Sequence, residues 1–321
     1  MTDTRSAVDT VVGQVLALLF RFRRANPADP CTQAPCAQCY ATHWARMRRF
    51  VEAGEPVHFV LPAFPAKSRN PNKVLGPLPD LGERLATSFL ESFCDQVAHF
   101  HEPGARITIC SDGHVFSDVL GISDDDVVAY RGELQRIIRA GGGGCVDVYS
   151  LENAYPGRSF DGMRELLVTA AAQPVGEIRD LVRQDERWRS LFNGIHRFMV
   201  EDQAALHPEL SRTKLRLRCK EMAYQVVRRS NAWGVLLGEV FPDAVRLSIH
   251  PQPCHSEKIG FHLIRTKDEW LTPWHGVVVD DGVTFTLVKR EQAERARASL
   301  VWRNSRPSHF VQPHPSAEKA A

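Results

Sequence analysis

Polar side chains that can bind anions or move protons recur where apolar stretches of this chain end. In chain order they are Lys67 and Lys73 after residues 57–61, Asp112, His114 and Asp118 after 106–110, Arg246, Ser248 and His250 toward the end of 245–249, and His275 before 276–279. Lysine and arginine can hold a phosphate or a carboxylate. Imidazole titrates near neutrality, which suits it to proton transfer. Four such sets are hard to explain as surface residues that only keep the protein in solution. We therefore expect one polar crevice that several strand ends share.

Each of these residues also has a purely structural interpretation. His114 could simply be exposed, Arg246 alternates with apolar neighbours and could face solvent, and His250 could shape the turn before a proline. Asp118 could cap a helical turn, and Lys258 fits a surface position. The residue types alone leave both interpretations open.

The stretch 57–80 is the one around which the rest of the chain is organised. Residues 57–61 form an apolar run typical of a buried strand. Pro62 ends it, because proline cannot donate a ladder hydrogen bond. A proline-rich, polar loop follows, and loops that leave the carboxyl ends of strands carry ligand contacts in open α/β sheets.

Strands and helices are expected to alternate around this stretch. We expect helices at 1–24, 43–53, 81–99 and 124–139, and strands at 57–61, 106–110 and 146–150. Mainly helical segments, 160–200 and 213–237, precede further strands at 245–249, 261–264, 276–279 and 284–288. This order predicts an α/β fold: a Rossmann-like, mostly parallel sheet flanked by helices, with a helical insertion and additional C-terminal strands.

The expected domain division follows from composition. Residues 1–35 form an N-terminal helix and linker, and 36–302 form one catalytic domain with a helical insertion at about 156–237. Residues 303–321, rich in Pro, Ser, Lys and Ala without periodicity, are expected to be disordered. The glycine run 141–144 follows a helix and precedes a strand, which is the reverse of a dinucleotide-binding fingerprint.

Composition bounds the class of protein. The 321 residues are 43% hydrophobic and 24% charged, with a net charge of +2, so nothing points to nucleic acid or an anionic membrane as a partner. The apolar run 15–20 is too short to span a bilayer, and its arginines follow it, unlike those of a signal peptide. We therefore expect a cytoplasmic protein.

The cysteines offer one possible metal site. Cys31, Cys36, Cys39 and His43 lie within thirteen residues, and four soft ligands at this spacing could hold a tetrahedral zinc. There is no second half-site nearby, however. We therefore favour a packed N-terminal cap with reduced thiols and predict no metal.

Five sequence blocks together resemble the pyoverdine/dityrosine biosynthesis family, whose best-known members are isocyanide (isonitrile) synthases. They are LPAFPAKSRNPNKVLGPLPD at 61–80, ICSDGHVFSDVLGISDDDVVAY at 109–130, RSNAWG at 229–234, RLSIHPQP at 246–253 and TPWHGVVV at 272–279. They occur in the expected order over most of residues 36–295. Two positions depart from the family pattern: Arg69 stands where proline is common, and His114 where arginine is frequent.

The resemblance implies a reaction in secondary-metabolite biosynthesis. Isocyanide synthases of this family convert the amino group of tryptophan or tyrosine to an isonitrile, using one carbon of ribulose 5-phosphate. The steps are imine formation, enolisation, loss of phosphate and carbon–carbon cleavage, so no cofactor is expected. A pathway neighbour is expected to be an iron- and 2-oxoglutarate-dependent oxygenase.

Site residues are assigned within the family blocks. We assign catalytic roles to Lys73, Asp112, His250 and His275, and substrate binding to Phe64, Lys67, Ser68, His114, Asp118, Arg229, Asn231, Arg246, Ser248, Lys258 and Trp274. Lysine and arginine would hold phosphate and carboxylate, the aspartates would receive the amine or sugar hydroxyls, and the histidines would move protons.

Two other functions stay open. One is an N-formylating amino-acid enzyme of the dityrosine-pathway type. The other is a noncatalytic protein that binds phosphosugars or amino acids. The sequence does not choose between tyrosine and tryptophan as the substrate.

Overall fold

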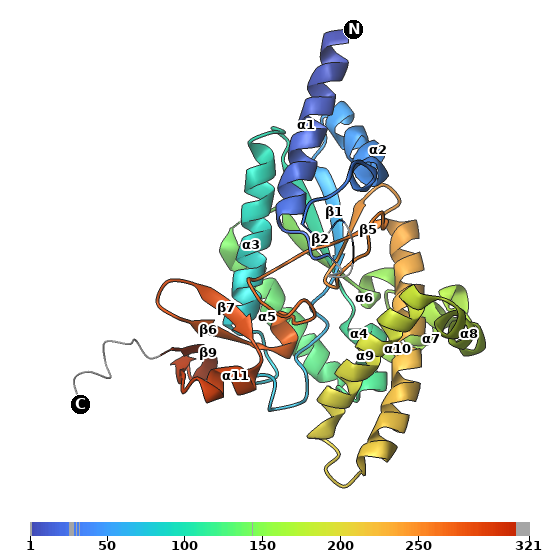
Figure 1. Cartoon of the computed structure of the whole chain (residues 1–321), viewed down its shortest axis with the longest axis vertical. Helices are drawn as coiled ribbons and strands as arrows, with labels where there is room; N and C mark the ends of the chain where they lie inside the picture. Colours follow the sequence, from blue (N-terminus) through green and yellow to red (C-terminus); the bar gives the residue numbers. More distant parts are fainter. Residues whose placement is uncertain (1, 26–28, 30, 32, 143, 313–321) are drawn as a thin grey trace, which may run out of the picture.

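A five-stranded sheet lies at the centre of the molecule (Figure 1). The computed structural model describes residues 2–25, 29, 31, 33–142 and 144–312. The strands are β1 (Val57–Pro62), β2 (Ala105–Ser111), β3 (Val146–Ser150), β4 (Val245–Ser248) and β5 (Lys258–Gly260). They pair in the order β3-β2-β1-β4-β5, and every pairing is parallel. The predicted Rossmann-like α/β fold is therefore confirmed.

The strand order reverses beside β1. The chain adds β2 and β3 on one side of β1, and then returns to place β4 and β5 on the other side. The loops that leave β1 and β4 therefore part in opposite directions at the carboxyl ends of these strands. Such a switch point leaves a crevice, which is where open α/β sheets bind ligands.

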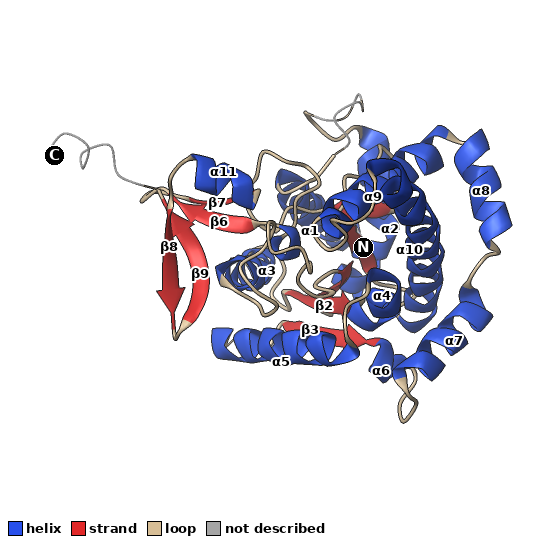
Figure 2. Cartoon of the chain, turned by 90° about the horizontal axis from the view of Figure 1, so that it is seen from below, coloured by secondary structure: helices blue, strands red, loops and turns tan. Residues whose placement is uncertain are grey.

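Helices cover both faces of the sheet (Figure 2). They are α1 (Thr2–Arg21), α2 (Ala37–Ala53), α3 (Leu81–Ala98), α4 (Gly113–Leu120), α5 (Asp124–Gly141), α6 (Leu151–Ala154), α7 (Phe160–Ala171), α8 (Val175–Gln184), α9 (Glu186–Ala204) and α10 (Arg212–Val240). Helices α1, α3 and α5 pack on one face, and α4, α7 and α10 on the other. Of the described helices, none has the length and apolarity to cross a bilayer.

Alternate strand residues supply the two cores. Phe59 and Ile107 point toward α1, α3 and α5, whereas Val60 and Cys110 point toward α4 and α10. Leu16 of α1 is fully buried in the first core. Burying one such side chain stabilises the fold by about 1.5–3 kcal/mol. The predicted boundary at residue 35 thus divides segments that share one core.

The helical insertion forms a separate layer against α4. Its helices α8, α9 and α10 bury a third apolar cluster that includes Phe192, Leu215 and Tyr224. The mainly helical segment expected at 160–200 contains three helices, α7, α8 and α9. Pro174 caps α8 and Asp185 caps α9, so each break occurs where a residue favours a helix start.

The last four strands of the chain form a second, smaller sheet on the far side of α3 (Figures 1 and 2). It consists of β6 (Val277–Asp280), β7 (Phe285–Val288), β8 (Ser299–Arg303) and β9 (Arg306–Val311), in the order β7-β6-β9-β8, with the short helices η1 (Pro273–His275) and α11 (Arg290–Arg295) beside it. Leu271, Val278 and Leu287 pack against Leu81 and Leu85 of α3. This sheet is thereby anchored to the main domain.

Three local predictions are wrong. Disorder from residue 303 is contradicted by β9, whose Phe310 is buried; residues 313–321 of that expected tail lie outside the described part. The strand expected at 261–264 is β5 at Lys258–Gly260, because Phe261 instead bridges to Arg23. The polar residues after β2 do not form a loop, since α4 starts at Gly113.

Candidate active site

A pocket opens at the switch point, at the carboxyl ends of β1, β2 and β4. It encloses about 1030 Å³, including its opening to solvent. One wall comes from the loop after β1 and the start of α4, and another from Ile249 and His250 after β4. Trp270 and the η1 residues Trp274 and His275 close one side, and α9 and α10 cover the rest. The crevice that parallel strands predict is therefore present.

Asp112 directly follows β2 and lines this pocket. Its side chain makes no cap hydrogen bond to α4, although it occupies the N-cap position. Its Oδ1 atom is buried and has no hydrogen-bond partner. Burial raises the pKa of the Asp112 carboxyl to about 7. Such a group can accept or release a proton near neutral pH.

His250 follows β4 and faces the same pocket. Its ring lies 5.3 Å from the ring of Trp270, centroid to centroid, and its buried Nδ1 atom has no hydrogen-bond partner. Burial, assisted by the positive charge of Arg24, lowers the pKa of His250 to about 3. The ring is therefore neutral near pH 7, with one nitrogen able to donate and the other to accept.

His275, Asp202 and Lys73 form a connected group at the pocket's edge. The Nε2 atom of His275 lies 3.4 Å from Oδ2 of Asp202, and Thr272 Oγ1 lies 3.0 Å from its Nδ1. Lys73 Nζ lies 2.5 Å from Asp202 Oδ1 and 4.8 Å from the ring centre of Phe198. Burial opposes ionisation of Asp202, but His275 and Lys73 outweigh it and hold the pKa of its carboxyl below the usual range.

The backbone of the β1 loop is held tightly against α4. A Cβ atom on Gly113 would lie 2.1 Å from the Pro65 carbonyl oxygen, so only glycine allows this approach. Phe64 adopts a left-handed conformation with φ of 57°, which is strained for a bulky residue. Its carbonyl accepts a 3.0 Å hydrogen bond from Ser111 Oγ, and its ring packs 5.1 Å from that of Trp274.

Lys67 lies behind the pocket. Its Nζ atom is 2.8 Å from Asp80, 2.9 Å from Glu83 and 2.9 Å from the Pro273 carbonyl. These acceptors occupy all three donors of the ammonium. The substrate-binding role of Lys67 stays a prediction; in the structure this lysine fixes the loop to the first turn of α3.

His114, Asp118 and Arg229 also lie outside the pocket lining. His114 stacks on Phe160 at 3.9 Å between ring centres and lies 3.2 Å from Glu152. Arg229 donates 2.9 Å to the Val115 carbonyl and forms a two-point ion pair with Asp118. The structure thus gives all three of these predicted binding residues a role in joining α4 to its neighbours.

Ser68 and Trp274 line the pocket, whereas four other predicted binding residues lie on α10 (Asn231), β4 (Arg246 and Ser248) and β5 (Lys258). Arg246 donates 2.9 Å to the Gly234 carbonyl, and Ser248 Oγ accepts from the His250 amide at 3.1 Å. Burial lowers the pKa of Lys258 to about 8. Asn231 Nδ2 is buried without a partner. None of the four lines the pocket.

A family model settles the relationship. The model described as pyoverdine/dityrosine biosynthesis protein matches residues 47–301. The chain belongs to the pyoverdine/dityrosine biosynthesis family. This confirms the resemblance carried by the five sequence blocks.

Within the family, several relatives resemble the whole chain. An L-tryptophan isonitrile synthase of Fischerella ambigua is 49% identical over 93% of this chain and 91% of its own length. An L-tyrosine isonitrile synthase of Pseudomonas aeruginosa is 41% identical over 98% of both chains. The crystal structure of PvcA from Pseudomonas aeruginosa matches with a TM-score of 0.89 and 41% identity, covering 94% of this chain and all of that one.

The site of this pyoverdine/dityrosine family member includes residues that sequence reasoning missed. Asp202, Phe198 and Trp270 contact or line the pocket, and Arg69 reaches it from the β1 loop. Asp202 lies on α9, a helix to which sequence reasoning assigned no site residue. Its contacts with Lys73, His275 and Ser68, the last of them 134 residues away, reveal it. Arg69 was noted only as a departure from the family pattern.

Proposed function

We propose that this chain is an isonitrile synthase that acts on the amino group of an aromatic L-amino acid, with ribulose 5-phosphate as the carbon donor. One observation carries the proposal: Asp112 and His250 each present an unpaired, buried polar atom to one largely apolar pocket. Groups held this way, with pKa values moved by burial, are typical of acid–base catalysis. The isonitrile synthases among the relatives support the reaction class.

The aromatic side chain would occupy the apolar end of the pocket. That end is lined by Phe116 of α4, Ile195 and Met199 of α9 and Val226 of α10. The nearby Gln203 amide already donates to the Leu120 carbonyl at 3.4 Å. A buried indole N–H and a buried phenol hydroxyl each need a hydrogen-bond partner, so this apolar wall alone does not choose between the two side chains. We infer tryptophan as the preferred substrate because the L-tryptophan isonitrile synthase of Fischerella ambigua is 49% identical to this chain, against 41% for the L-tyrosine isonitrile synthase of Pseudomonas aeruginosa.

Asp112 would act first as a base. An amino acid binds with its amine protonated, and the amine must lose a proton before it attacks the ketone of ribulose 5-phosphate. Asp112, with its pKa near 7, can take that proton at pH 7 to 8. Neutral His250 would then transfer protons during imine formation and enolisation, since one ring nitrogen can donate while the other accepts.

Lys73 and Arg69 are the cations placed to attract the phosphate. Arg69 lines the pocket, and its guanidinium also donates to the Gly121 carbonyl. Lys73 reaches the edge through Asp202, which also contacts His275. Lys73 would have to leave the Asp202 carboxylate before it could bind the phosphate. Binding of the sugar phosphate would therefore change the protonation of Asp202 and His275.

The test is product analysis with isotopes. Purified protein is incubated with ¹⁵N-tryptophan or ¹⁵N-tyrosine and uniformly ¹³C-labelled ribulose 5-phosphate, and the product is examined by mass spectrometry and infrared spectroscopy. We expect a product that retains ¹⁵N, carries one ¹³C and shows the isonitrile stretch, formed faster from tryptophan. A formamide would instead support the N-formylating alternative. No product from either amino acid would refute the proposal.

A further inference from the structure

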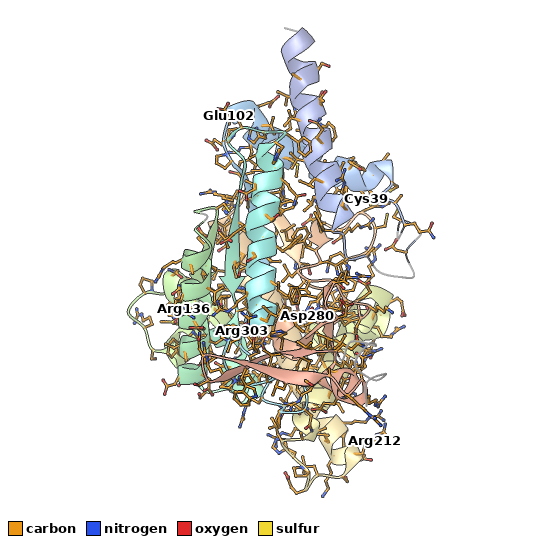
Figure 3. All side chains as sticks on the ribbon, turned by 90° about the vertical axis from the view of Figure 1, so that its left-hand side faces the viewer. Cys39, Glu102, Arg136, Arg212, Asp280 and Arg303 are labelled. Carbon is orange, nitrogen blue, oxygen red and sulfur yellow. The ribbon has the colours of Figure 1, made fainter. Side chains whose placement is uncertain are left out.

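Four cysteines from distant parts of the chain converge at the edge of the main domain. The sulfur atoms of Cys31, Cys36, Cys39 and Cys254 all lie within 4.8 Å of one another. Figure 3 labels Cys39, which lies on α2 beside the lower end of α1. All four thiols are free, and the cluster lies apart from the residues that line the active-site pocket.

The four sulfur atoms are close enough together to share one metal ion at the centre of the cluster. A tetrahedral zinc with Zn–S bonds of about 2.3 Å holds its sulfurs about 3.8 Å apart. The Cys36 sulfur lies 3.8 Å from that of Cys39 and 3.7 Å from that of Cys254. The Cys254 sulfur lies 3.4 Å from Cys39 and 3.0 Å from Cys31. A tetrahedral set of four thiolates is the donor set that selects zinc.

A disulfide explains this geometry less well. One disulfide joins two sulfurs and gives the other two no reason to converge on it. Here the Cys254 sulfur is close to three others at once, which is the arrangement that a shared central ion requires. We propose that these four cysteines bind a structural zinc ion.

The local backbone suits a negatively charged metal–thiolate centre. Cys36 is the N-cap of α2 and Cys39 lies in its first turn, so the positive end of the helix dipole faces the cluster. Cys36 makes no side-chain cap bond, which leaves its sulfur free to be a ligand. The Nε2 atom of His255 lies 3.2 Å from this sulfur, where its N–H can donate to a bound thiolate. The amide of Cys254 donates 2.6 Å to Asp29.

The fourth ligand differs from the one that the sequence offered. The motif placed His43 after Cys39, but His43 is buried within α2 and interacts with the backbone of Ser256. Cys254, more than 200 residues along the chain, takes its place. This distant residue supplies the second half-site whose absence argued against zinc.

The ion would join the N-terminal segment to the loop that carries His250. Ala25 bridges to Gln252 in parallel, and the Arg24 amide donates 2.8 Å to the Gly260 carbonyl. A Cβ atom on Gly260 would lie 2.0 Å from the Arg24 carbonyl oxygen, so the two segments are in close contact. Zinc at Cys254 would fix this loop four residues after His250, in addition to stabilising the fold.

The first experiment measures metal content in the full chain. Protein produced with zinc in the medium and purified without chelators is analysed by plasma mass spectrometry, beside Cys39→Ser, Cys254→Ser and Cys145→Ser. We expect about one zinc per chain in the wild type and in Cys145→Ser, whose thiol lies outside the cluster, and a loss of at least tenfold in the other two. Chelation should lower the melting temperature of the wild type by at least about 5 °C.

A second experiment uses only the wild-type protein, so its result does not depend on whether a variant folds. Cobalt(II) added to reduced, metal-free wild type should give thiolate-to-cobalt charge-transfer bands and tetrahedral d–d bands, and zinc should abolish them. Wild type that holds no zinc and gives no cobalt spectrum would refute the proposal. So would iron in place of zinc, or a disulfide between Cys31 and Cys254 in protein isolated under air-free conditions.

Discussion

At the scale of single residues, burial moves Asp112 and His250 toward their neutral forms. The pKa of Asp112 rises to about 7 and that of His250 falls to about 3. Between these values both groups are neutral, and above pH 7 Asp112 alone becomes charged. Their environments therefore assign the base role to Asp112 and a neutral, two-way hydrogen-bonding role to His250.

The first prediction concerns Asp112. If its carboxylate is the base, kcat/KM should rise with pH and level off above about pH 7. Asp112→Asn should lower kcat by about 10²–10⁴-fold, because it removes the proton acceptor and keeps the shape. Both are measured by steady-state kinetics from pH 5.5 to 9. A wild-type profile that is flat across this range would argue against the assignment.

We also predict how Asp112→Asn changes the stability of the fold. Because the folded-state pKa is raised, the contribution of Asp112 is present below about pH 4 and is lost as pH rises through 7. Asp112→Asn should therefore unfold at a temperature equal to or higher than the wild type at pH 8, and the difference should shrink toward pH 5. A variant that is less stable at pH 8 would show that the carboxylate has a structural partner.

The second prediction concerns His250. His250→Ala should lower kcat by about 10²–10⁴-fold and leave the fold intact, because the unpaired Nδ1 atom has no structural bond to lose. His196→Ala is the matched control, since this half-buried histidine on α9 contacts Phe192 and the Arg216 carbonyl and lies outside the pocket lining. Circular dichroism verifies folding before the kinetics are compared. Equal activity in the two variants would remove His250 from the mechanism.

The sequence could place some site residues and not others for a physical reason. Asp112 and His250 follow strand ends directly, and topology alone brings strand ends together. Asp202 enters the site through helix packing, which local spacing does not encode. Lys67 follows a strand end too, but its contacts with Asp80 and Glu83 depend on where α3 begins in space.

At the scale of elements, the β1 loop and α3 are joined by buried charges. The α3 N-terminus has a capping box in which Asp80 accepts from Gly82 and Glu83 accepts from Asp80. Lys67 bridges the two carboxylates, and Tyr130 of α5 donates 3.1 Å to Glu83. Burial raises the pKa of Asp80 to about 7 despite the attraction of Lys67. Removing that lysine would leave the buried carboxyl groups of Asp80 and Glu83 without their positive partner, which destabilises the fold.

The third prediction tests this junction. Lys67→Met should destabilise the fold by about 3–5 kcal/mol at pH 8, because it leaves buried carboxylates unpaired. The loss should be smaller at pH 5, where these acids protonate more readily. Lys73→Met is the comparison: it should lower turnover with a smaller loss of stability, because Asp202 keeps its contacts with Ser68 and His275. Denaturant unfolding measures both. Equal stability of the two variants would contradict the structural role of Lys67.

The elements themselves were predictable where local signals agreed. Apolar runs that a proline or glycine precedes or follows predicted β1 to β4, and the strand–helix alternation predicted the sheet. The signals failed for β8, where no strand was predicted, and for β9, where the tail composition suggested disorder. Its buried Phe310 is stabilised by packing against Val277, a contact that composition does not reveal.

At the scale of the whole molecule, the pocket belongs to three parts of the chain. The loop after β1 and the region of α4 supply Pro65, Ala66, Ser68, Arg69 and part of 112–122, the helical insertion supplies part of 195–206 and Val226, and the segment after β4 supplies part of 249–275. Few bonds cross between these parts at the pocket, chiefly those of Asp202 with Ser68, Lys73 and His275. An amino acid bound there would contact all three parts together.

The last prediction follows from this construction. Tryptophan at about 100 times its Kd stabilises the folded state by about 2.7 kcal/mol through mass action. Since its contacts join separate parts, hydrogen exchange should slow in 195–206 and 270–275 together, and stay unchanged in α8, whose residues lie outside the pocket. Hydrogen–deuterium exchange with mass spectrometry compares protein with and without tryptophan. Protection confined to one part would mean that the amino acid binds to that part alone, and the pocket would then need a second substrate to close it.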